Sequence, residues 1–315
     1  MIVREARACR WKSLATVIAV VVTLPLLSGG CAVLDGPVLD PKGPITLAER
    51  DLFFKAIAIM MIVIVPVFIM AAIFVWRYRG TNRKARYSPN IAYYWPAEVL
   101  VWGVPALIIV WLAIHLWHNT YKLDPYNAID PSVQALQVEA IGQDWKWLFV
   151  YPEQNIAVVN ELAIPVNTPI SIRITSDTVM NSLVIPALGG QIYAMAGMQT
   201  RLNLLADKEG TFWGRNVQYS GKGFADMQFQ TRAMSKEDFD AWVEKAKQSA
   251  KTLDAATYEV LAKPSEKVPV TYYSGVEPDL FDKIIAKYMH GDSHLMPHHK
   301  QAEITEWDQW ISSDD

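Results

Sequence analysis

Residues 219–230 read YSGKGFADMQFQ, and they separate two segments that have the pattern of β-strands. The first segment is 211–218; in the second, Met227, Phe229 and Thr231 alternate with polar residues, which is the period of a half-buried strand. The stretch is therefore predicted to be a loop at one end of a small β-sandwich. A copper protein would place thiolate and imidazole ligands in such a loop, and this loop has neither Cys nor His.

The same alternation recurs upstream from residue 133 and predicts further short strands. Its apolar positions are Leu136, Val138 and Ala140, then Ile170, Ile172 and Ile174, then Leu202 and Leu204. Pro165, Gly189, Gly190 and Gly210 interrupt the pattern, as turn residues do. Short strands at this spacing predict an all-β Greek-key sandwich within residues 119–232.

Histidine and cysteine are missing from a much longer part of the chain. The histidines are His115, His118, His290, His294, His298 and His299, and the cysteines are Cys9 and Cys31. Residues 119–289 therefore cannot form a copper site of the His and Cys types, a thiolate zinc site, a disulfide or a His-based catalytic triad. The soluble domain is predicted to be redox-inert. A net charge of −3 gives no basic footprint for nucleic acid.

Two long apolar runs precede the sandwich and predict a transmembrane hairpin over residues 52–118. The first helix is predicted at about 56–76, with Pro66 inside it, and the second at about 97–117; each run is long enough to cross a bilayer. The connector 77–95 is rich in Arg and Lys, which favours a cytoplasmic position. Both termini and the soluble domain are then expected outside the cytoplasm.

The N-terminal residues 1–30 have a basic start, an apolar run and small residues before Cys31, which is typical of a secretory signal peptide. Two interpretations of Cys31 stay open. In the first, Cys31 is the acylated N-terminus of a lipoprotein, although Leu27 lies one position further from it than the lipoprotein pattern requires. In the second, the signal peptide is cleaved after Gly30 in the ordinary way and Cys31 is a free thiol. Residues 31–51 are predicted to be a periplasmic linker.

Residues 233–290 form an aromatic-rich extension that is predicted to be helical. Ser235 and Asp238 make a capping box, and later helices are expected at 255–262 and 278–289. The simplest role of the aromatic residues is to cover an apolar face of the sandwich. Residues 291–315 are predicted to be a disordered tail, in which His294, Met296, His298 and His299 leave a soft-metal site as the alternative.

Three stretches carry a resemblance to a known family: QDWKW at 143–147, VMNSLVIP at 179–186 and YSGKG at 219–223. They resemble subunit II of the haem-copper respiratory oxidases, and within that family the cytochrome bo-type ubiquinol oxidase branch. The resemblance extends over residues 44–289. It implies a cupredoxin-like fold for the sandwich, and it identifies 233–290 with an aromatic motif of quinol oxidase subunits.

The resemblance also implies that a copper-A centre has been lost from the predicted loop. In copper-bearing relatives the positions of Asn181 and Met227 hold His, those of Tyr219 and Gly223 hold Cys, that of Gly221 holds Glu and that of Gln230 holds Met. No catalytic, cofactor-binding or metal-binding residue is therefore expected on this chain. Trp145 matches the residue through which electrons enter in the copper branch, and here a packing role is expected for it.

The partners follow from the same resemblance. It implies a polytopic subunit I that carries haems, copper and the ubiquinol site, further small membrane subunits, membrane lipid, and no cytochrome c. The chain would be a non-catalytic subunit of a proton-pumping ubiquinol oxidase in the bacterial inner membrane. Glu98, seven residues before Pro105, would lie at the entry of a proton path. The alternative for Glu98 is an acid solvated at the headgroup level.

Two other functions are weighed against this one. A copper-A subunit of a cytochrome c oxidase conflicts with the absence of His and Cys from residues 119–289. A free-standing, membrane-anchored periplasmic binding or assembly protein on a cupredoxin scaffold fits the fold equally well, because a fold does not fix a function. The residues do not distinguish ubiquinol from menaquinol as the electron donor.

Overall fold

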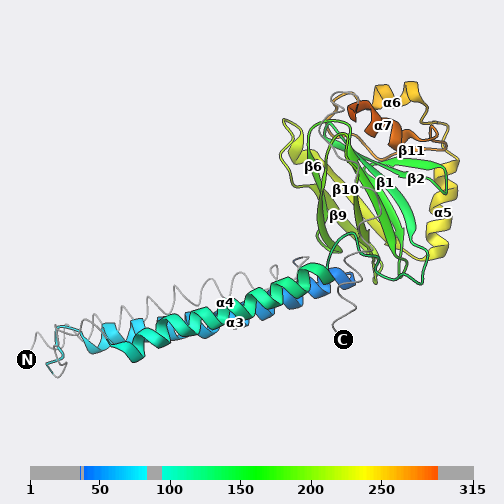
Figure 1. Ribbon diagram of the computed structural model, residues 1–315. Helices are drawn as coiled ribbons and strands as arrows, with labels where there is room; N and C mark the ends of the chain where they lie inside the picture. The colour runs from blue at the N-terminus through cyan, green and yellow to red at the C-terminus, as the bar shows by residue number, and fades with distance from the viewer. Residues whose placement is uncertain (1–35, 37–38, 84–93, 290–315) are drawn as a thin grey trace, which may run out of the picture.

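The computed structural model describes residue 36 and residues 39–83 and 94–289. It consists of a long helical hairpin and a β-sandwich with a C-terminal extension (Figure 1). The predicted signal peptide, Cys31, the tail 291–315 and part of the connector 77–95 lie outside the described residues.

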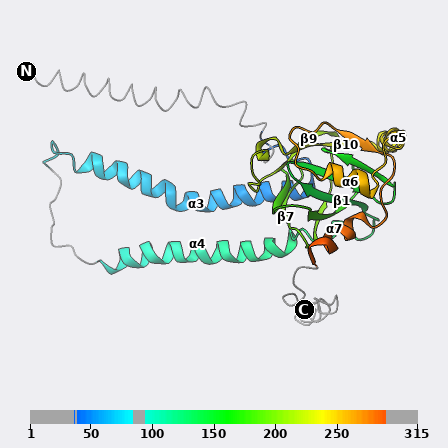
Figure 2. The same ribbon diagram turned by 90° about the horizontal axis from the view of Figure 1, so that it is seen from above.

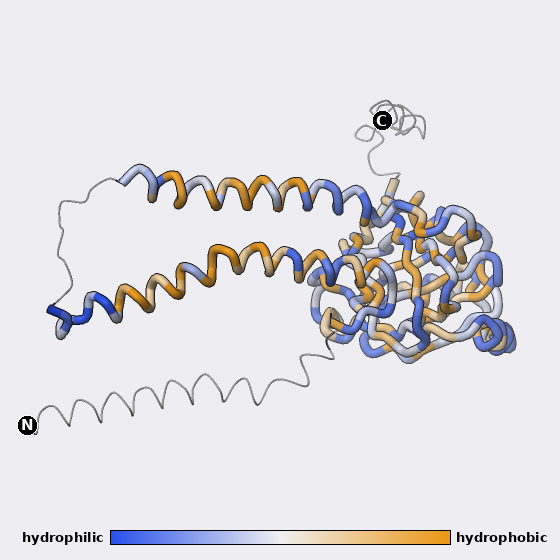
Figure 3. Tube along the Cα trace, turned by 90° about the horizontal axis from the view of Figure 1, so that it is seen from below, coloured by the Kyte–Doolittle hydropathy of each residue, from blue (hydrophilic) through white to orange (hydrophobic). Residues whose placement is uncertain are grey.

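The hairpin consists of α3 (Pro44–Arg77) and α4 (Trp95–Lys122). Both helices are long and apolar enough to cross a membrane, and Figure 2 shows them running side by side away from the sandwich. In Figure 3 the apolar colour predominates along the middle of both helices, and hydrophilic residues gather toward their ends. Most of the apolar side chains are exposed, so the hairpin is a membrane element that still needs lipid or another protein around it.

The helices are longer than the sequence predicted. The predicted linker 31–51 includes residues 44–51, which are helical, and the end of α4 at Lys122 passes the predicted boundary at 118. The linker prediction is wrong for 44–51, because Pro44 occupies a favourable first position of the helix. In addition, the first turn packs against the sandwich, where a Cβ on Gly189 would lie 2.9 Å from Ile45 and 3.0 Å from Thr46.

The sandwich has two sheets, which confirms the predicted cupredoxin-like architecture. One sheet has the order β11-β3-β2-β1-β5-β8 and the other β4-β10-β9-β6-β7. The strands are β1 (Leu136–Gln143), β2 (Lys146–Tyr151), β3 (Ile156–Val159), β4 (Glu161–Pro165), β5 (Ile170–Ser176), β6 (Asn181–Ile185), β7 (Gly189–Ala194), β8 (Thr200–Leu204), β9 (Gly210–Asn216), β10 (Gln228–Met234) and β11 (Thr271–Tyr273). Two pairs of neighbouring strands are parallel, β1 with β5 and β4 with β10. Parallel neighbours cannot be joined by a tight hairpin, and here the chain passes through the other sheet between the two strands of each pair.

The core lies between the two sheets, as the period-two pattern predicts. The alternating apolar residues of β1, β5 and β8 are buried there, together with Trp147, Phe149 and Phe229. The ring of Phe229 lies 4.9 Å from that of Phe149 and 6.2 Å from that of Trp147, centroid to centroid. A large aromatic cluster of this kind stabilises a small domain in which no disulfide can form, because residues 119–289 contain no Cys.

The extension contains α5 (Lys236–Lys247), α6 (Ala255–Leu261), β11 and α7 (Leu280–Met289). The predicted cap is present, since the Asp238 amide donates to the Ser235 hydroxyl over 3.1 Å. The predicted helices are present, and the extension also contains a short strand that the sequence analysis did not predict, β11, whose β-branched and aromatic residues pair with the edge strand β3. Helices α6 and α7 cover the outer face of the six-stranded sheet with buried Tyr258, Phe281 and Ile284, so the predicted covering role is confirmed.

Candidate functional site

The candidate site is one end of the sandwich, which we call the rim. It comprises the loops 144–145, 160, 177–180, 195–199 and 217–227. The hairpin docks at the opposite end, where the Lys42 amide donates to the Ala187 carbonyl over 3.0 Å. The resemblance assigns copper ligands to six positions. Four of them lie in the rim loop 217–227, and a fifth, Asn181, directly follows the rim loop 177–180.

Asn181 and Met227 are brought together by a residue that the sequence did not single out, Asn216. The Asn216 amide nitrogen lies 2.7 Å from the Asn181 carbonyl oxygen and 3.2 Å from the Met227 sulfur. Its own oxygen accepts from the Ser182 backbone amide over 2.8 Å. All these residues are buried, so a neutral hydrogen-bonded cluster fills the space between the two loops.

Asn216 gave only a weak signal in the sequence. It is an amide at the end of the predicted strand 211–218, and its partners are 34 and 35 residues away along the chain. The pairing of β6 with β9 brings them together. Only the tertiary structure therefore identifies Asn216 as the centre of the cluster.

Trp145 packs against the positions of Gly221 and Gly223. Its indole nitrogen donates to the Ser220 carbonyl over 3.0 Å. A Cβ at Gly223 would lie 2.5 Å from the Trp145 ring, and one at Gly221, whose φ is +105°, would lie 3.6 Å from it. The ring thus occupies the room that a larger residue at 223 would need, as expected from the predicted packing role of Trp145.

Tyr219 and Gln230 are not part of this cluster. Tyr219 is 74% exposed, and its ring lies 5.7 Å from that of Phe224. Gln230 is on β10, opposite Trp213 on one side and Glu161 on the other. The structure therefore joins Asn181, Met227 and the two glycines around Asn216 and Trp145, and it separates Tyr219 and Gln230 from them.

The chemistry of the rim does not fit copper. Amide groups are poor ligands for a soft metal, and the thioether of Met227 is the one soft donor among the six positions. That sulfur already accepts a hydrogen bond from Asn216. Among the described residues, there is no group of three or more His, Cys, Asp or Glu side chains that could hold a metal ion.

Asp177 is a buried acid in the rim loop that precedes Asn181. Its carboxylate accepts from the Tyr258 hydroxyl over 2.8 Å, from the Lys287 ammonium over 2.8 Å and from the Tyr288 hydroxyl over 3.0 Å. Burial, and then the carboxylate, raise the pKa of Tyr258, while the hydrogen bond raises the pKa of Lys287. Helices α6 and α7 are thereby fixed to the rim.

A second link to the extension is made by Lys146. Its side chain is fully buried, and its ammonium donates to the Lys263 carbonyl over 2.9 Å and to the Ser265 hydroxyl over 2.8 Å. Burial lowers the pKa of Lys146, and nearby Asp144 opposes this shift. Next to it, the Asn160 amide donates to the Val268 carbonyl over 2.8 Å.

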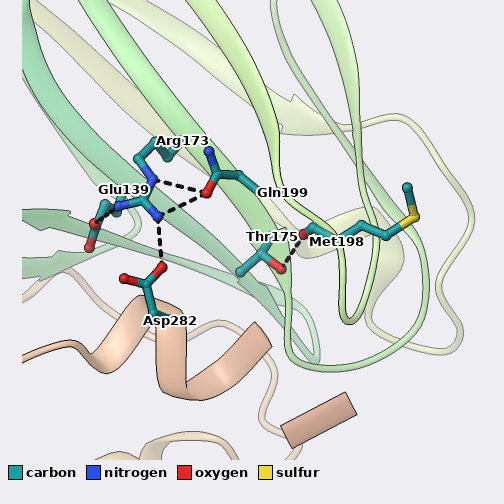
Figure 4. A network of polar contacts seen from close by, with 6 residues as sticks. All are labelled: Glu139, Arg173, Thr175, Met198, Gln199 and Asp282. Atoms are coloured by element: carbon teal, nitrogen blue, oxygen red, sulfur yellow. Dashed lines mark hydrogen bonds and ion pairs between the residues drawn. The ribbon is translucent and has the colours of Figure 1, made fainter. Parts of the chain in front are cut away.

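Arg173 fixes α7 to the six-stranded sheet beside the rim (Figure 4). The guanidinium lies between Glu139 at 3.0 Å, Asp282 at 2.7 Å and Gln199 at 2.8 Å. It also stacks on the Phe281 ring, 4.5 Å from the centroid. Burial raises the pKa of Glu139, and Arg173 opposes that shift.

A second buried carboxylate, Glu161, lies at the start of β4 on the flank of the sandwich. One of its oxygens accepts from the Trp242 indole over 2.7 Å and from the Tyr272 hydroxyl over 2.8 Å. Arg232 lies 3.9 Å from the other oxygen. This acid therefore fixes α5 and β11, as Asp177 fixes α6 and α7.

Glu98 lies in the first turn of α4. Its carboxylate accepts a hydrogen bond from the Trp102 indole over 3.2 Å, and the side chain is otherwise exposed on the surface of the hairpin. An ionisable group on a membrane helix is a candidate for proton transfer. Its assignment to a proton path stays a prediction.

Two family models match the chain. The periplasmic domain of cytochrome c oxidase subunit II matches residues 110–234, and the aromatic-rich motif of cytochrome oxidases matches residues 247–292. A cytochrome bo(3) ubiquinol oxidase subunit 2 from Pseudomonas putida is 48% identical over 277 residues, 88% of this chain and 87% of the relative. A ubiquinol oxidase subunit 2 from Acetobacter aceti is 50% identical over 268 residues, 84% of this chain and 86% of the relative. These relatives confirm the resemblance predicted from the sequence.

Proposed function

The chain belongs to the quinol oxidase subunit 2 family, and on that premise we propose that it is the non-catalytic subunit II of a proton-pumping ubiquinol oxidase. In this complex ubiquinol is oxidised to ubiquinone and dioxygen is reduced to water. Haems and copper belong to a polytopic subunit I. This chain anchors beside that subunit and caps its periplasmic face.

The observation that carries the proposal is the neutral cluster around Asn216. An electron that entered at Trp145 from a soluble cytochrome c would need a redox centre behind it, and the residues there are Asn181, Asn216 and Met227. The indole of Trp145 is already hydrogen-bonded to Ser220. Electrons therefore reach subunit I from quinol within the bilayer, and no cytochrome c docks on this chain.

Exposed apolar surface supports the packing of this chain against membrane partners. The two helices of the hairpin leave most of their apolar side chains uncovered. The sandwich also extends to one side of the hairpin axis (Figure 1), and its rim exposes Val179 (54%), Met180 (40%) and Met198 (40%). Methionine-rich apolar surface is typical of protein contacts, so a subunit beside the hairpin would be covered by the rim.

We propose that the complex lies in the bacterial inner membrane, with both termini of this chain in the periplasm. The basic connector between the helices supports this orientation. Acylation of Cys31 would add a lipid anchor to the chain ahead of α3. Intact-mass analysis of the purified chain tests the acylation, and a mass without added acyl groups would exclude it.

Glu98 is proposed to lie at the entry of a proton path into subunit I. Glu98→Ala should slow oxygen reduction and proton uptake in the assembled complex without changing its subunit content. Glu98→Gln should behave in the same way, because it keeps the Trp102 contact and removes the charge. Unchanged turnover in both variants would leave Glu98 as a solvated surface acid.

Purification through a tag on this chain tests the function. We expect haem-bearing subunits to co-purify, with an oxidase absorption spectrum and with activity toward ubiquinol that is absent with reduced cytochrome c. A menaquinol analogue assayed in parallel identifies the donor. A chain that purifies alone, without haem, would instead support the free-standing binding or assembly protein.

A further inference from the structure

The C-terminal extension contacts each loop of the rim or the strand residue beside it. Lys146 and Asn160 bind its segment 263–268, and Asp177 binds α6 and α7. Tyr288 packs on Gly197, where an added Cβ would lie 3.1 Å from the Tyr288 Cβ. These contacts come from distant parts of the sequence and converge on one end of the sandwich.

The longest rim loop, 217–227, is reached through two ion pairs. Lys222 lies 3.1 Å from Glu266, and Asp226 lies 3.9 Å from Lys267. Both lysine side chains are largely exposed, so each pair is a weak contact by itself. The segment 263–268 nevertheless links this loop to Lys146 and Asn160, whose contacts are buried or partly buried.

The resemblance assigns copper ligands to two of these loops, at 181 and at 219–230. A metal bound by both loops would cross-link them, because metal binding fixes the residues that supply its ligands. In this chain the links between them are neutral: the Asn181–Asn216–Met227 cluster and the hydrogen bond from the Val217 amide to the Ser182 carbonyl, 3.1 Å long. Neutral hydrogen bonds contribute less to stability than charged ones do.

We propose that the aromatic-rich extension has the further function of cross-linking the rim loops, in place of a metal, from the outside of the sandwich. Asp177 is its principal anchor, because this acid is buried and lies four residues before Asn181 on the same loop. When α6 and α7 hold Asp177, they also hold the loop that ends at Asn181. This inference rests on the proposed function, in which the rim carries no copper.

Glu161 supplies a matched control on the same extension. It is also buried and also accepts hydrogen bonds from aromatic side chains. It lies on a strand, however, where the backbone is already held by pairing with β10. Weakening this anchor should loosen α5 and β11 and leave the rim loops 177–180 and 217–227 as they are.

The test is amide hydrogen exchange, measured by mass spectrometry on the full chain purified in detergent with its complex. In Asp177→Asn we expect peptides that cover 177–181 and 217–227 to exchange about tenfold faster than in the wild type, because the charged acceptor is lost. In Glu161→Gln we expect the increase in 236–247 and 271–273 only. Tyr258→Phe, which removes a single hydroxyl, should give a smaller increase at the rim and serves if Asp177→Asn does not fold.

Two results would overturn the inference: rim exchange that is unchanged in Asp177→Asn and Tyr258→Phe, or rim exchange that rises equally in Glu161→Gln. Neither result bears on whether the chain is an oxidase subunit, since the haem spectrum of the same samples reports that separately. Faster rim exchange with a normal haem spectrum supports the inference. A wild-type sample without haem would refute the proposed function and leave the cross-linking measurement valid.

Discussion

Asp177 and Glu161 are buried acids that bind the same extension with similar chemistry, but they lie in different kinds of backbone. Glu161 is on β4 and accepts from Trp242 and Tyr272. Asp177 is in a loop between two strands and accepts from Tyr258, Lys287 and Tyr288. The Glu161 side chain is 7% exposed and the Asp177 side chain is 1% exposed, so neither acid forms its contacts at the open surface.

The difference shows where such an anchor changes more than stability. A strand is held by its neighbours through backbone hydrogen bonds, so an added side-chain anchor there mainly stabilises the segment that binds it. The loop 177–180 has less of that support, although the Asp177 amide donates to the Gly142 carbonyl over 2.8 Å, so an anchor on it also restrains the loop conformation. The extension therefore completes the sandwich at Glu161 and shapes the rim at Asp177.

Removal of the Asp177 carboxylate is expected to have the largest effect. Asp177→Ala should lower the free energy of unfolding by about 3 kcal/mol, because it leaves the buried Tyr258 hydroxyl without its charged acceptor. Chemical denaturation of the full chain in detergent, followed by tryptophan fluorescence, measures the change. Glu161→Ala should cost about 2 kcal/mol; an equal or larger cost for Glu161→Ala would contradict the ranking of the two anchors.

The rim should also resist a thiol at position 223, where the resemblance predicts a copper ligand in copper-bearing relatives. Gly223→Cys should destabilise the domain by about 2 kcal/mol, since its Cβ would lie 2.5 Å from the Trp145 ring and overpacking of this kind costs about 1–3 kcal/mol. Gly275→Ala is the control, because the nearest atom to its added Cβ is 3.9 Å away. If Gly223→Cys is as stable as Gly275→Ala, Trp145 moves aside freely and the rim still has room for a thiol at this position.

The sequence predicts the sandwich and the hairpin well, because both depend on repeating local patterns. The alternation at Leu136, Val138 and Ala140 requires only that one face of a strand is buried, and the uncharged run 56–76 requires only a bilayer. The ends of the helices are less predictable. Residues 44–51 become helical partly through contacts with Gly189, which is far away in the chain.

For the candidate site, the sequence predicts mainly which residues are missing. The sequence shows that copper ligands are missing from 219–230, but the residues that replace them depend on tertiary contacts. Asn216 acquires its role through the pairing of β6 with β9, and Asp177 through helices that follow it by about eighty residues or more. No local pattern distinguishes these two side chains from ordinary polar residues.

The smallest expected effect appears at alkaline pH, where the two anchors can be compared through their tyrosines. Burial, followed by the contact with Glu161, raises the pKa of Tyr272 from 10.0 to about 12. The protonated hydroxyl is therefore favoured in the folded state, so its contribution to stability is complete below pH 10 and is lost as the pH rises toward 12. The free energy of unfolding should decline in that range, and Tyr272→Phe should make the decline shallower.

Tyr258→Phe should also make the decline shallower, because burial and Asp177 raise the pKa of Tyr258 as well. An unchanged slope in both variants would show that neither hydroxyl is held in its protonated form by the fold.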